Sequence, residues 1–538
     1  MKPLLDFLQK KGKLFSLLII SIIFLIIPMK IIQYGWLPSD DARRHVAFST
    51  LDCKWSDILV IDKKFDTDHN AGWHQILRFL HKKLGFTKEG LIRFSVVGLF
   101  LLINIVGIII SPSPICWVLA LLSFLIFDIG VLYRMILGRP YIMSCISTLL
   151  VLRLWALPNS NTEFVTKQKK YLRIALTIIL FSLGTWIHGS WYIFLMIPFS
   201  FLLAGKIKES LLLTLCVITG TLIGAAMTGN FVDFLSYHFN ATLNIYSEKT
   251  FNWLLVTENS SGVQNTYFIP FLFAIIALCI YKKKLTFKEL TTDPAFLLVL
   301  LTWLLSIEVI RFWIDWGRMA LLFWLSYRFK DLIDSSETLK EPRVRYSLFL
   351  FVVCAVFFIT TNDGGGRFSK DVFDQPIDFS EKRLAGWAPE PGGIVYSDSM
   401  GVFFKHFYEY PTAPWKYILG FESAIMPTED KKVLRRIGYN FKLPDEYLPW
   451  INKMTKADRL ITVGSVGDFP QLESIRGARN YWIYRLKTAT DTADINASET
   501  ANMNATATAN INASGTANMN ATATATINSS ETININSK

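Results

Sequence analysis

The fold class is decided by the apolar segment "LFSLLIISIIFLIIPMKII" (14–32), which leads into the charged segment "YGWLPSDDARRHVAFS" (34–49). A helix needs ~20 apolar residues to cross the hydrocarbon core of a bilayer, and the first segment meets that length. Lys10, Lys11 and Lys13 precede it, as in a signal peptide, but no cleavage site of small residues follows. We therefore expect a retained membrane helix that opens into a strongly charged loop.

Similar apolar segments recur along the 538 residues, which are 51% hydrophobic and 14% aromatic. A helix satisfies its own backbone hydrogen bonds in lipid, so these segments predict a polytopic α-helical membrane protein. The cysteines form no disulfide framework. The eleven predicted spans are 14–32, 92–110, 115–134, 141–157, 172–187, 190–204, 209–227, 266–281, 295–310, 318–329 and 346–361.

The net charge of +12 lies in the loops between apolar segments, which argues against a nucleic-acid partner. With the amino terminus in the cytoplasm, all the strongly basic loops fall on the inner side, as the positive-inside rule requires. These loops are 166–173, 206–208, 282–290 and 328–345. The pattern predicts a multi-pass protein of the inner or plasma membrane.

Three regions follow from this topology. Residues 1–361 are the predicted transmembrane domain, and 33–91 are its first extracytoplasmic loop. Residues 362–487 combine Gly and Pro turns with strand-like and amphipathic stretches, which indicates a small extracytoplasmic α/β domain. Residues 488–538 repeat "INASETANMNATATA" almost unchanged, and such a polar segment is expected to be disordered because it cannot bury a core.

Ionisable side chains gather at the outer ends of the predicted spans, where they are costly and tend to mark a functional site. We take Asp40 and Asp41 as the candidate catalytic carboxylates. The candidates for binding substrate or phosphate are Arg43, Arg44, His45, Arg139, His188, Arg311 and Arg318. The secondary candidates are Asp68, His69, His74 and Asp128.

These residue types suit one chemistry. Adjacent carboxylates can act as a general base toward a hydroxyl, or hold a divalent cation such as Mg²⁺ or Mn²⁺. Arginines at span ends can grip a phosphate whose lipid tail lies in the bilayer. Interfacial tryptophans can stack on sugar faces. The combination predicts sugar transfer from a lipid-phosphate donor.

The layout resembles the GT-C superfamily of integral-membrane glycosyltransferases, and "SDDA" (39–42) is similar to the acidic pair of its arabinofuranosyltransferase-like branch. The resemblance implies a catalytic carboxylate in the first outer loop and a polyprenyl-phosphate sugar donor. The acceptor would be a glycan, lipid or protein of the cell envelope. "RRH", which follows the pair, does not match that branch, so the subfamily stays open. "WIDWGR" (313–318) is similar to an oligosaccharyltransferase motif, but it lies between predicted spans, so we treat the likeness as chance.

Each candidate also has a structural interpretation. Asp40 or Asp41 could cap a helix, because "PSDDA" is a good helix start. The loop "DTDHNAGWH" (66–74) could be merely polar, or it could hold a transition metal. Arginines at span ends could snorkel to the interface. The main functional alternative is a transporter or flippase of lipid-linked sugars, for which the sequence shows neither internal repeats nor broken spans. A non-catalytic scaffold would leave the acidic pair unexplained.

Overall fold

The computed structural model describes residues 2–38, 40–156, 167–237, 240, 268–370 and 375–487. The chain is divided into two compact units, of which the first contains Met1–Phe469 and Ser474–Arg485 and holds the sites described below. The second contains Pro470–Glu473 and Leu486–Lys538, and in it the backbone N–H of Lys487 donates to the carbonyl of Gln471 (3.1 Å). Ser39 of the acidic motif and the repeat region 488–538 lie outside the described residues.

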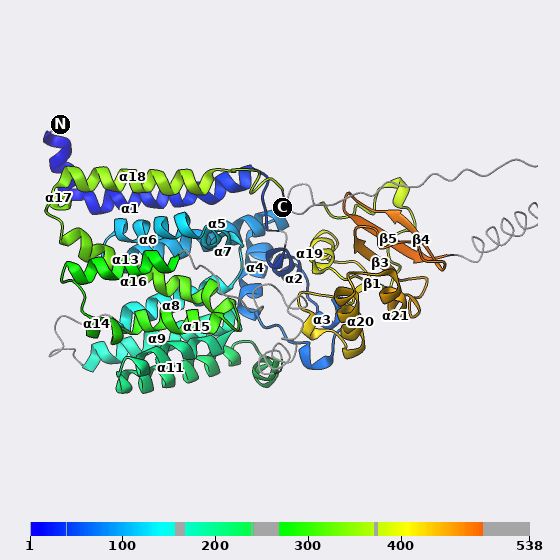
Figure 1. The fold of residues 1–538 in the computed structure, drawn as a ribbon. Coiled ribbons are helices and arrows are strands. Elements are labelled where there is room, and N and C mark those ends of the chain that lie inside the picture. Colours follow the sequence, from blue (N-terminus) through cyan, green and yellow to red (C-terminus); the bar gives the residue numbers. More distant parts are fainter. Residues whose placement is uncertain are drawn as a thin grey trace, which may run out of the picture. The chain divides into compact units, whose positions relative to one another are not determined.

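The membrane part of the chain consists of long and short apolar helices (Figure 1). Five helices have the length and composition to cross a membrane: α1 (Lys2–Gln33), α5 (Lys88–Ile110), α9 (Lys167–Ile187), α11 (Ile207–Ala226) and α18 (Pro342–Thr361). A sixth is possible if the bent pair α6 (Pro114–Phe127) and α7 (Gly130–Ile136) is one span. The shorter apolar helices are α8 (Tyr141–Trp155), the segment Trp191–Leu203 that includes α10 (Met196–Leu203), α13 (Phe268–Tyr281) and α15 (Pro294–Ser306).

The structure is therefore that of a helical membrane protein, but the prediction of eleven spans is wrong for the described residues. Every predicted span overlaps a helix, yet only five helices, or six with the bent pair counted as one, are long and apolar enough to cross a membrane. The helices α6 and α7 meet at a bend of 115°, so the prediction of an unbroken span over 115–134 is wrong as well. Hydropathy reports how apolar a segment is, but a turn inside it depends on the packing of its neighbours.

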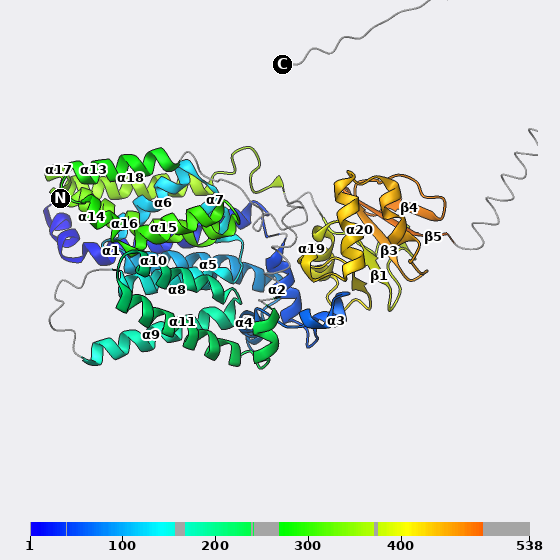
Figure 2. The same cartoon turned by 60° about the horizontal axis from the view of Figure 1, so that its bottom comes forward.

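Close helix packing in this part depends on small residues, as is common in membranes. The helices α9 and α11 lie side by side in both views (Figure 1 and Figure 2). A Cβ added at Gly224 of α11 would lie 2.5 Å from the carbonyl oxygen of Ser182 in α9, and one at Gly220 would lie 2.6 Å from Phe181. Only glycine allows this approach, because a backbone atom cannot move aside as a side chain can.

A π-helical segment at Phe312–Gly317 precedes α16 (Arg318–Asp334). The short helices α14 (Phe287–Thr291) and α17 (Glu337–Lys340) lie before α15 and α18, respectively. The first outer loop contributes α2 (Asp41–Ser49), α3 (Trp55–Ile58), the 3₁₀ turn Lys63–Phe65 and α4 (Ala71–Leu84). These elements place Asp41, His45 and His74 on helices, whereas Asp68 and His69 lie in the loop before α4.

A five-stranded sheet forms the centre of the carboxyl-terminal region. Its strands are β1 (Ile394–Tyr396), β2 (Lys416–Tyr417), β3 (Arg459–Val463), β4 (Leu472–Arg476) and β5 (Tyr481–Leu486), in the order β2-β1-β3-β5-β4. β1 is parallel to β2 and β3, whereas β3 and β5 are antiparallel. The helices are α19 (Met400–Glu409), α20 (Thr428–Tyr439) and α21 (Leu448–Ile451), with 3₁₀ turns at Lys382–Leu384, Ser423–Ile425 and Pro444–Tyr447. The small α/β arrangement agrees with the prediction from sequence.

The first outer loop and the sheet region share one hydrophobic core. Phe48 and Trp55 of the loop are buried together with Phe403 and Phe421 of the sheet region. Trp55 stacks on Phe48 at 4.0 Å between ring centroids and meets Phe421 edge-on at 5.0 Å. The N–H of Val60 donates to the carbonyl of Tyr417 (3.0 Å), which extends the pairing of β2 into the loop. Neither segment can bury this surface without the other.

Candidate functional site

The acidic pair, Asp40 and Asp41, lies at the start of α2. Asp40 occupies the N-cap position, but its side chain makes no capping hydrogen bond, so the structural interpretation of Asp40 as a cap is wrong. Instead Oδ2 of Asp40 accepts from Nη2 of Arg139 at 2.6 Å. Oδ1 of Asp40 is buried and has no hydrogen-bond partner among the described residues. An orphaned carboxylate oxygen is costly and is a position at which a ligand hydroxyl would be stabilised.

Asp41 has a different environment. One turn along α2, Arg44 places its Nε 2.8 Å from Oδ1 of Asp41. Burial raises the pKa of Asp41, but Arg44, Arg139 and His69 outweigh this effect and lower it to about 2. Asp41 is therefore ionised at physiological pH and is a poor proton acceptor, so its charge rather than its basicity is what it contributes.

Three of the predicted residues form a line of hydrogen bonds beside the acidic pair. Nδ1 of His45 lies 2.8 Å from Nε2 of His74, whose Nδ1 lies 2.7 Å from Oδ2 of Asp68. The two imidazoles are each only 1% exposed. His69 lies next to this line but outside it, with its ring stacked on that of Tyr237 at 5.1 Å. The polar-loop interpretation of 66–74 is therefore wrong for His74, which belongs to a buried network on α4.

Arg43 is turned away from its neighbours in sequence. Its Nε donates to the carbonyl of Pro38 (3.0 Å), and its guanidinium lies 5.3 Å from the ring centre of Tyr408. The prediction that Arg43 joins Arg44 in binding phosphate has no support in this geometry, because Arg43 contacts Pro38 and Tyr408 whereas Arg44 pairs with Asp41.

A second cluster is centred on Asp315, which is fully buried between two arginines. Nε of Arg134 donates to Oδ1 of Asp315 at 2.9 Å, and Nε of Arg311 lies 3.3 Å from Oδ2. We call Arg134, Asp315 and Arg311 the buried triad. Nη2 of Arg311 also contacts Nε2 of His188 (3.3 Å), and His188 contacts the hydroxyl of Ser144 (3.1 Å). The predicted candidates Arg311 and His188 are thus brought together.

Arg134 and Asp315 are site residues that were not predicted from the sequence. Asp315 belongs to "WIDWGR", which was set aside as a chance likeness, and the structure places it in the π-helical segment before α16. Arg318, at the start of α16, pairs with Asp128 at the break between α6 and α7. One signal in the sequence could have identified these residues. Charged residues beside apolar spans are energetically costly and tend to mark a functional site, and WIDWGR places Asp315 between two predicted spans and Arg318 at the start of the second.

The acidic pair and the buried triad are connected through the start of α8. Arg139 holds Asp40, and two residues later the hydroxyl of Tyr141 donates to the carbonyl of Arg134. The guanidinium of Arg134 lies 4.6 Å from the ring centre of Tyr141. The turn before α8 therefore contacts the acidic pair, and the first residue of α8 contacts the buried triad.

The described residues contain no group of three or more His, Cys, Asp or Glu side chains arranged to hold a metal ion. The suggested transition-metal site at Asp68, His69 and His74 is thus wrong as a three-ligand group, since His74 is hydrogen-bonded to Asp68 and His45. A Mg²⁺ or Mn²⁺ ion at the acidic pair stays a prediction. Each carboxylate there is paired with an arginine, which competes with any cation.

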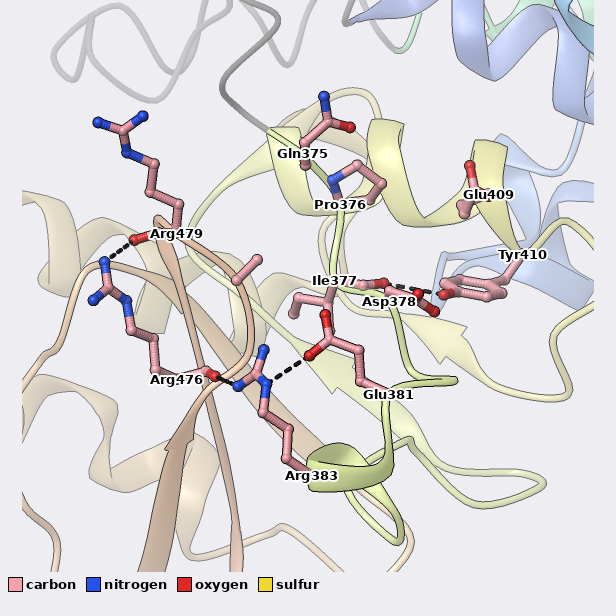
Figure 3. Close-up of a pocket in the computed structure, with 11 residues that line it drawn as sticks. Gln375, Pro376, Ile377, Asp378, Glu381, Arg383, Glu409, Tyr410, Arg476 and Arg479 are labelled. Atoms are coloured by element: carbon pink, nitrogen blue, oxygen red, sulfur yellow. Dashed lines mark hydrogen bonds and ion pairs between the residues drawn. The ribbon is translucent and has the colours of Figure 1, made fainter.

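A separate polar cavity of about 620 Å³ lies in the sheet region, and Figure 3 shows its lining. Arg383 donates to Glu381 (2.5 Å) and to the carbonyl of Gly477 (2.7 Å), and Arg476 donates to the carbonyl of Arg479 (2.6 Å). These contacts use the arginines to join segments of the fold. None of the site residues predicted from sequence lines this cavity.

No family model matches this chain, and no curated protein sequence matches it. The likeness to the GT-C superfamily consequently depends on the layout of the chain and on the acidic pair.

Proposed function

We propose that the protein is an integral-membrane glycosyltransferase of the GT-C type. It transfers a sugar from a polyprenyl-phosphate donor to an extracytoplasmic glycan, lipid or protein. The observation that carries the proposal is the state of Asp40: Arg139 fixes one carboxylate oxygen at 2.6 Å, while the other is buried and has no partner. Such a carboxylate is held in place and keeps one oxygen for the hydroxyl of an acceptor.

In the proposed step, Oδ1 of Asp40 takes the proton of the acceptor hydroxyl as general base. The acceptor oxygen forms a bond to the anomeric carbon. The bond from that carbon to the phosphate oxygen breaks, and the polyprenyl phosphate leaves with the electron pair. Asp41 is the weaker candidate for the base because its pKa of about 2 makes it a poor proton acceptor.

The leaving phosphate would be balanced by guanidinium groups at the span ends. Arg139, Arg311 and Arg318 are each already paired with a carboxylate, so a phosphate would use their remaining N–H groups. The divalent cation expected at the acidic pair is left out of the step, because an arginine contacts each carboxylate there.

The site is proposed to lie on the extracytoplasmic side of the inner or plasma membrane. One argument supports this side. The basic loops lie at the opposite ends of the spans from the site residues. The segments 33–91 and 362–487 share a hydrophobic core, so both are proposed to lie on that same side.

One observation favours a second candidate, a transporter or flippase of lipid-linked sugars. Such proteins use broken helices beside their substrate, and α6 and α7 form a break of 115° at Asp128. The same arginines would bind the phosphate in that case, but the acidic pair would have no proton to accept.

The test is sugar transfer by the purified full-length protein in detergent or nanodiscs, with a panel of radiolabelled polyprenyl-phosphate sugars. Asp40→Asn removes the basicity and should lower the rate by about 10²–10⁴-fold at an unchanged protein level. The matched control is Asp52→Asn, a loop aspartate that is 70% exposed and pairs with Lys82, and it should transfer sugar at the wild-type rate.

Equal rates for Asp40→Asn and the wild type would contradict the proposal. A second outcome would favour the transporter: wild-type protein reconstituted in vesicles moves a lipid-linked sugar across the membrane and forms no transfer product.

A further inference from the structure

A buried hydrogen-bond chain joins α2 to the residues that precede and begin α4. Its members are Arg44, His45, His74 and Asp68. Nη2 of Arg44 lies 3.3 Å from Nε2 of His45, and the next contacts are 2.8 Å and 2.7 Å. Because both imidazoles are buried, solvent water cannot reach the hydrogen bonds that they form.

The two ends of the hydrogen-bond chain have fixed roles. Arg44 can only donate, since a guanidinium has no acceptor. Asp68 is ionised: burial raises its pKa, but His74, His69 and the hydrogen bond from the backbone of Asn70 outweigh this and lower it. Its second oxygen, Oδ1, accepts from the backbone N–H of Asn70 at 3.0 Å. Donation therefore begins at Arg44 and ends at Asp68.

These ends determine the tautomer of each histidine. Nε2 of His45 must accept from Arg44, so the proton of His45 is on Nδ1 and is donated to Nε2 of His74. His74 then carries its own proton on Nδ1 and donates it to Asp68. The opposite direction would put an N–H of His45 against an N–H of Arg44. Asp41 cannot accept a hydrogen bond from Nε2 of His45 instead, because its Oδ2 is 3.8 Å from that nitrogen, beyond hydrogen-bond distance.

The hydrogen-bond chain acts on Arg44, which is itself only 2% exposed. Arg44 is held by Asp41 at 2.8 Å, by His45 at 3.3 Å, and by the ring of Phe421 at 4.0 Å from the ring centre. Of these contacts, only the one to His45 depends on a tautomer. Phe421 belongs to the sheet region, so that region also contributes to the position of Arg44.

We propose that His45, His74 and Asp68 are positioning residues, whose fixed tautomers hold the guanidinium of Arg44 against Asp41. The effect on sugar transfer rests on the proposed function. The tautomers themselves do not, and they can be measured without a substrate.

Asp68→Asn should invert the whole chain. The native carboxylate accepts two N–H groups, one on each oxygen, whereas an amide has one oxygen and an NH₂ group. The backbone N–H of Asn70 requires the oxygen, so the NH₂ group faces Nδ1 of His74. His74 and then His45 must move their protons to Nε2, and His45 presents an N–H to Arg44. A wrong tautomer of this kind disables a catalytic histidine in the serine-protease triad.

The experiment is ¹⁵N spectroscopy of the full-length protein with labelled histidines, assigned with His45→Gln and His74→Gln. The sequence has seven histidines. His406 is an internal reference for the Nδ1–H tautomer, since its Nδ1 donates to the carbonyl of Val402 and its Nε2 accepts from Ile377. His45 and His74 should match this reference in the wild type and lose the match in Asp68→Asn.

The control variant is Asp66→Asn, two residues away. Asp66 accepts from the N–H and hydroxyl of Ser56 and has no part in the chain, so this change should leave both tautomers as they are. Asp68→Asn should also lower kcat for sugar transfer by about 10–100-fold with little change in KM, because the effect is one of position.

The outcomes separate the two proposals. Nε2–H or doubly protonated His45 and His74 in the wild type would overturn the chain, and this measurement stands even if Asp68→Asn does not fold. Inverted tautomers with an unchanged kcat would overturn the positioning role. Wild-type tautomers as expected, in a protein that transfers no sugar, would support the chain and overturn only the glycosyltransferase.

Discussion

The buried triad gives a prediction that does not depend on the activity. Asp315 is fully buried, and it is the shared partner of Arg134 and Arg311, whose side chains are 11% and 21% exposed. Asp315→Asn keeps the size of the side chain but removes its charge. Two guanidinium groups would then face each other without a carboxylate between them.

The loss of stability expected for Asp315→Asn follows from the cost of leaving a buried charge uncompensated. Removing one partner of a buried ion pair costs about 3–5 kcal/mol. In a protein of this size, each kcal/mol of lost unfolding free energy is expected to lower Tm by roughly 1–2 °C, since the shift in Tm per kcal/mol falls as proteins become larger. Asp315→Asn should therefore lower Tm by about 3–10 °C. The control is Asp334→Asn, whose i,i+4 pair with Lys330 is half exposed and should contribute about 0.3–0.5 kcal/mol.

The assay is thermal unfolding of the purified full-length protein in one detergent, followed by intrinsic fluorescence. A triple variant, Arg134→Met with Asp315→Leu and Arg311→Met, should recover much of the lost Tm, because apolar side chains can replace a buried ion triad without loss of stability. The same variant should lose sugar transfer if Arg311 binds the phosphate. A Tm for Asp315→Asn equal to that of the wild type would refute the account of the triad.

Three further predictions concern other parts of the chain. Burial lowers the pKa of His406 to about 4, against about 6.5 in an unfolded chain, so the unfolded state binds the extra proton between these values. Stability should accordingly fall by up to about 3 kcal/mol as the pH drops from 6.5 to 4, and His406→Gln should flatten this fall in Tm measured from pH 7.5 to 4.5. Gly224→Val should lower the free energy of unfolding by about 1–3 kcal/mol, because the valine side chain would collide with the carbonyl of Ser182. The control, Ala226→Val on the exposed face of the same helix, should leave it unchanged. Equal Tm values for the two variants would contradict the packing argument. Truncation after Lys487 should leave Tm and sugar transfer unchanged, since the repeats have almost no large apolar side chains, and a loss of activity would show that the tail has a role.

Much of the fold could be predicted because it follows from local composition. Apolar segments predicted the helices of the membrane part, strand-like stretches predicted β1 and β3, and an amphipathic stretch predicted α20. The span count failed for three reasons: four apolar helices are short, one predicted span is broken at Asp128, and α16, which overlaps the predicted span 318–329, is not among the apolar helices. Whether an apolar helix crosses, ends early or bends depends on what it packs against, which composition does not report.

The candidate site was predicted in its residue types but not in its connections. Sequence placed Asp40, Asp41 and His45 on one segment, and the helix α2 accounts for their proximity. It did not pair Asp40 with Arg139, which is 99 positions away, and it gave no role to Arg134, which is 181 positions from Asp315. It also assigned the first outer loop and the sheet region to separate domains, although they share a core.

The sequence by itself indicated the surroundings of each segment: apolar stretches suit a membrane, and charged or turn-rich stretches suit water. These are properties of neighbouring residues, and hydropathy and charge report them directly. Tertiary structure alone decided which carboxylate keeps an oxygen without a hydrogen bond and which one has its pKa lowered to about 2. Arg139, which precedes α8, pairs with one oxygen of Asp40, and α4 brings His74 within 2.8 Å of His45. The main partner of Asp41 is Arg44 of the same helix, and the folded chain adds the charges of Arg139 and His69. Electrostatic interactions are set by distance and burial in the folded chain, and neither is a property of the order of residues along it.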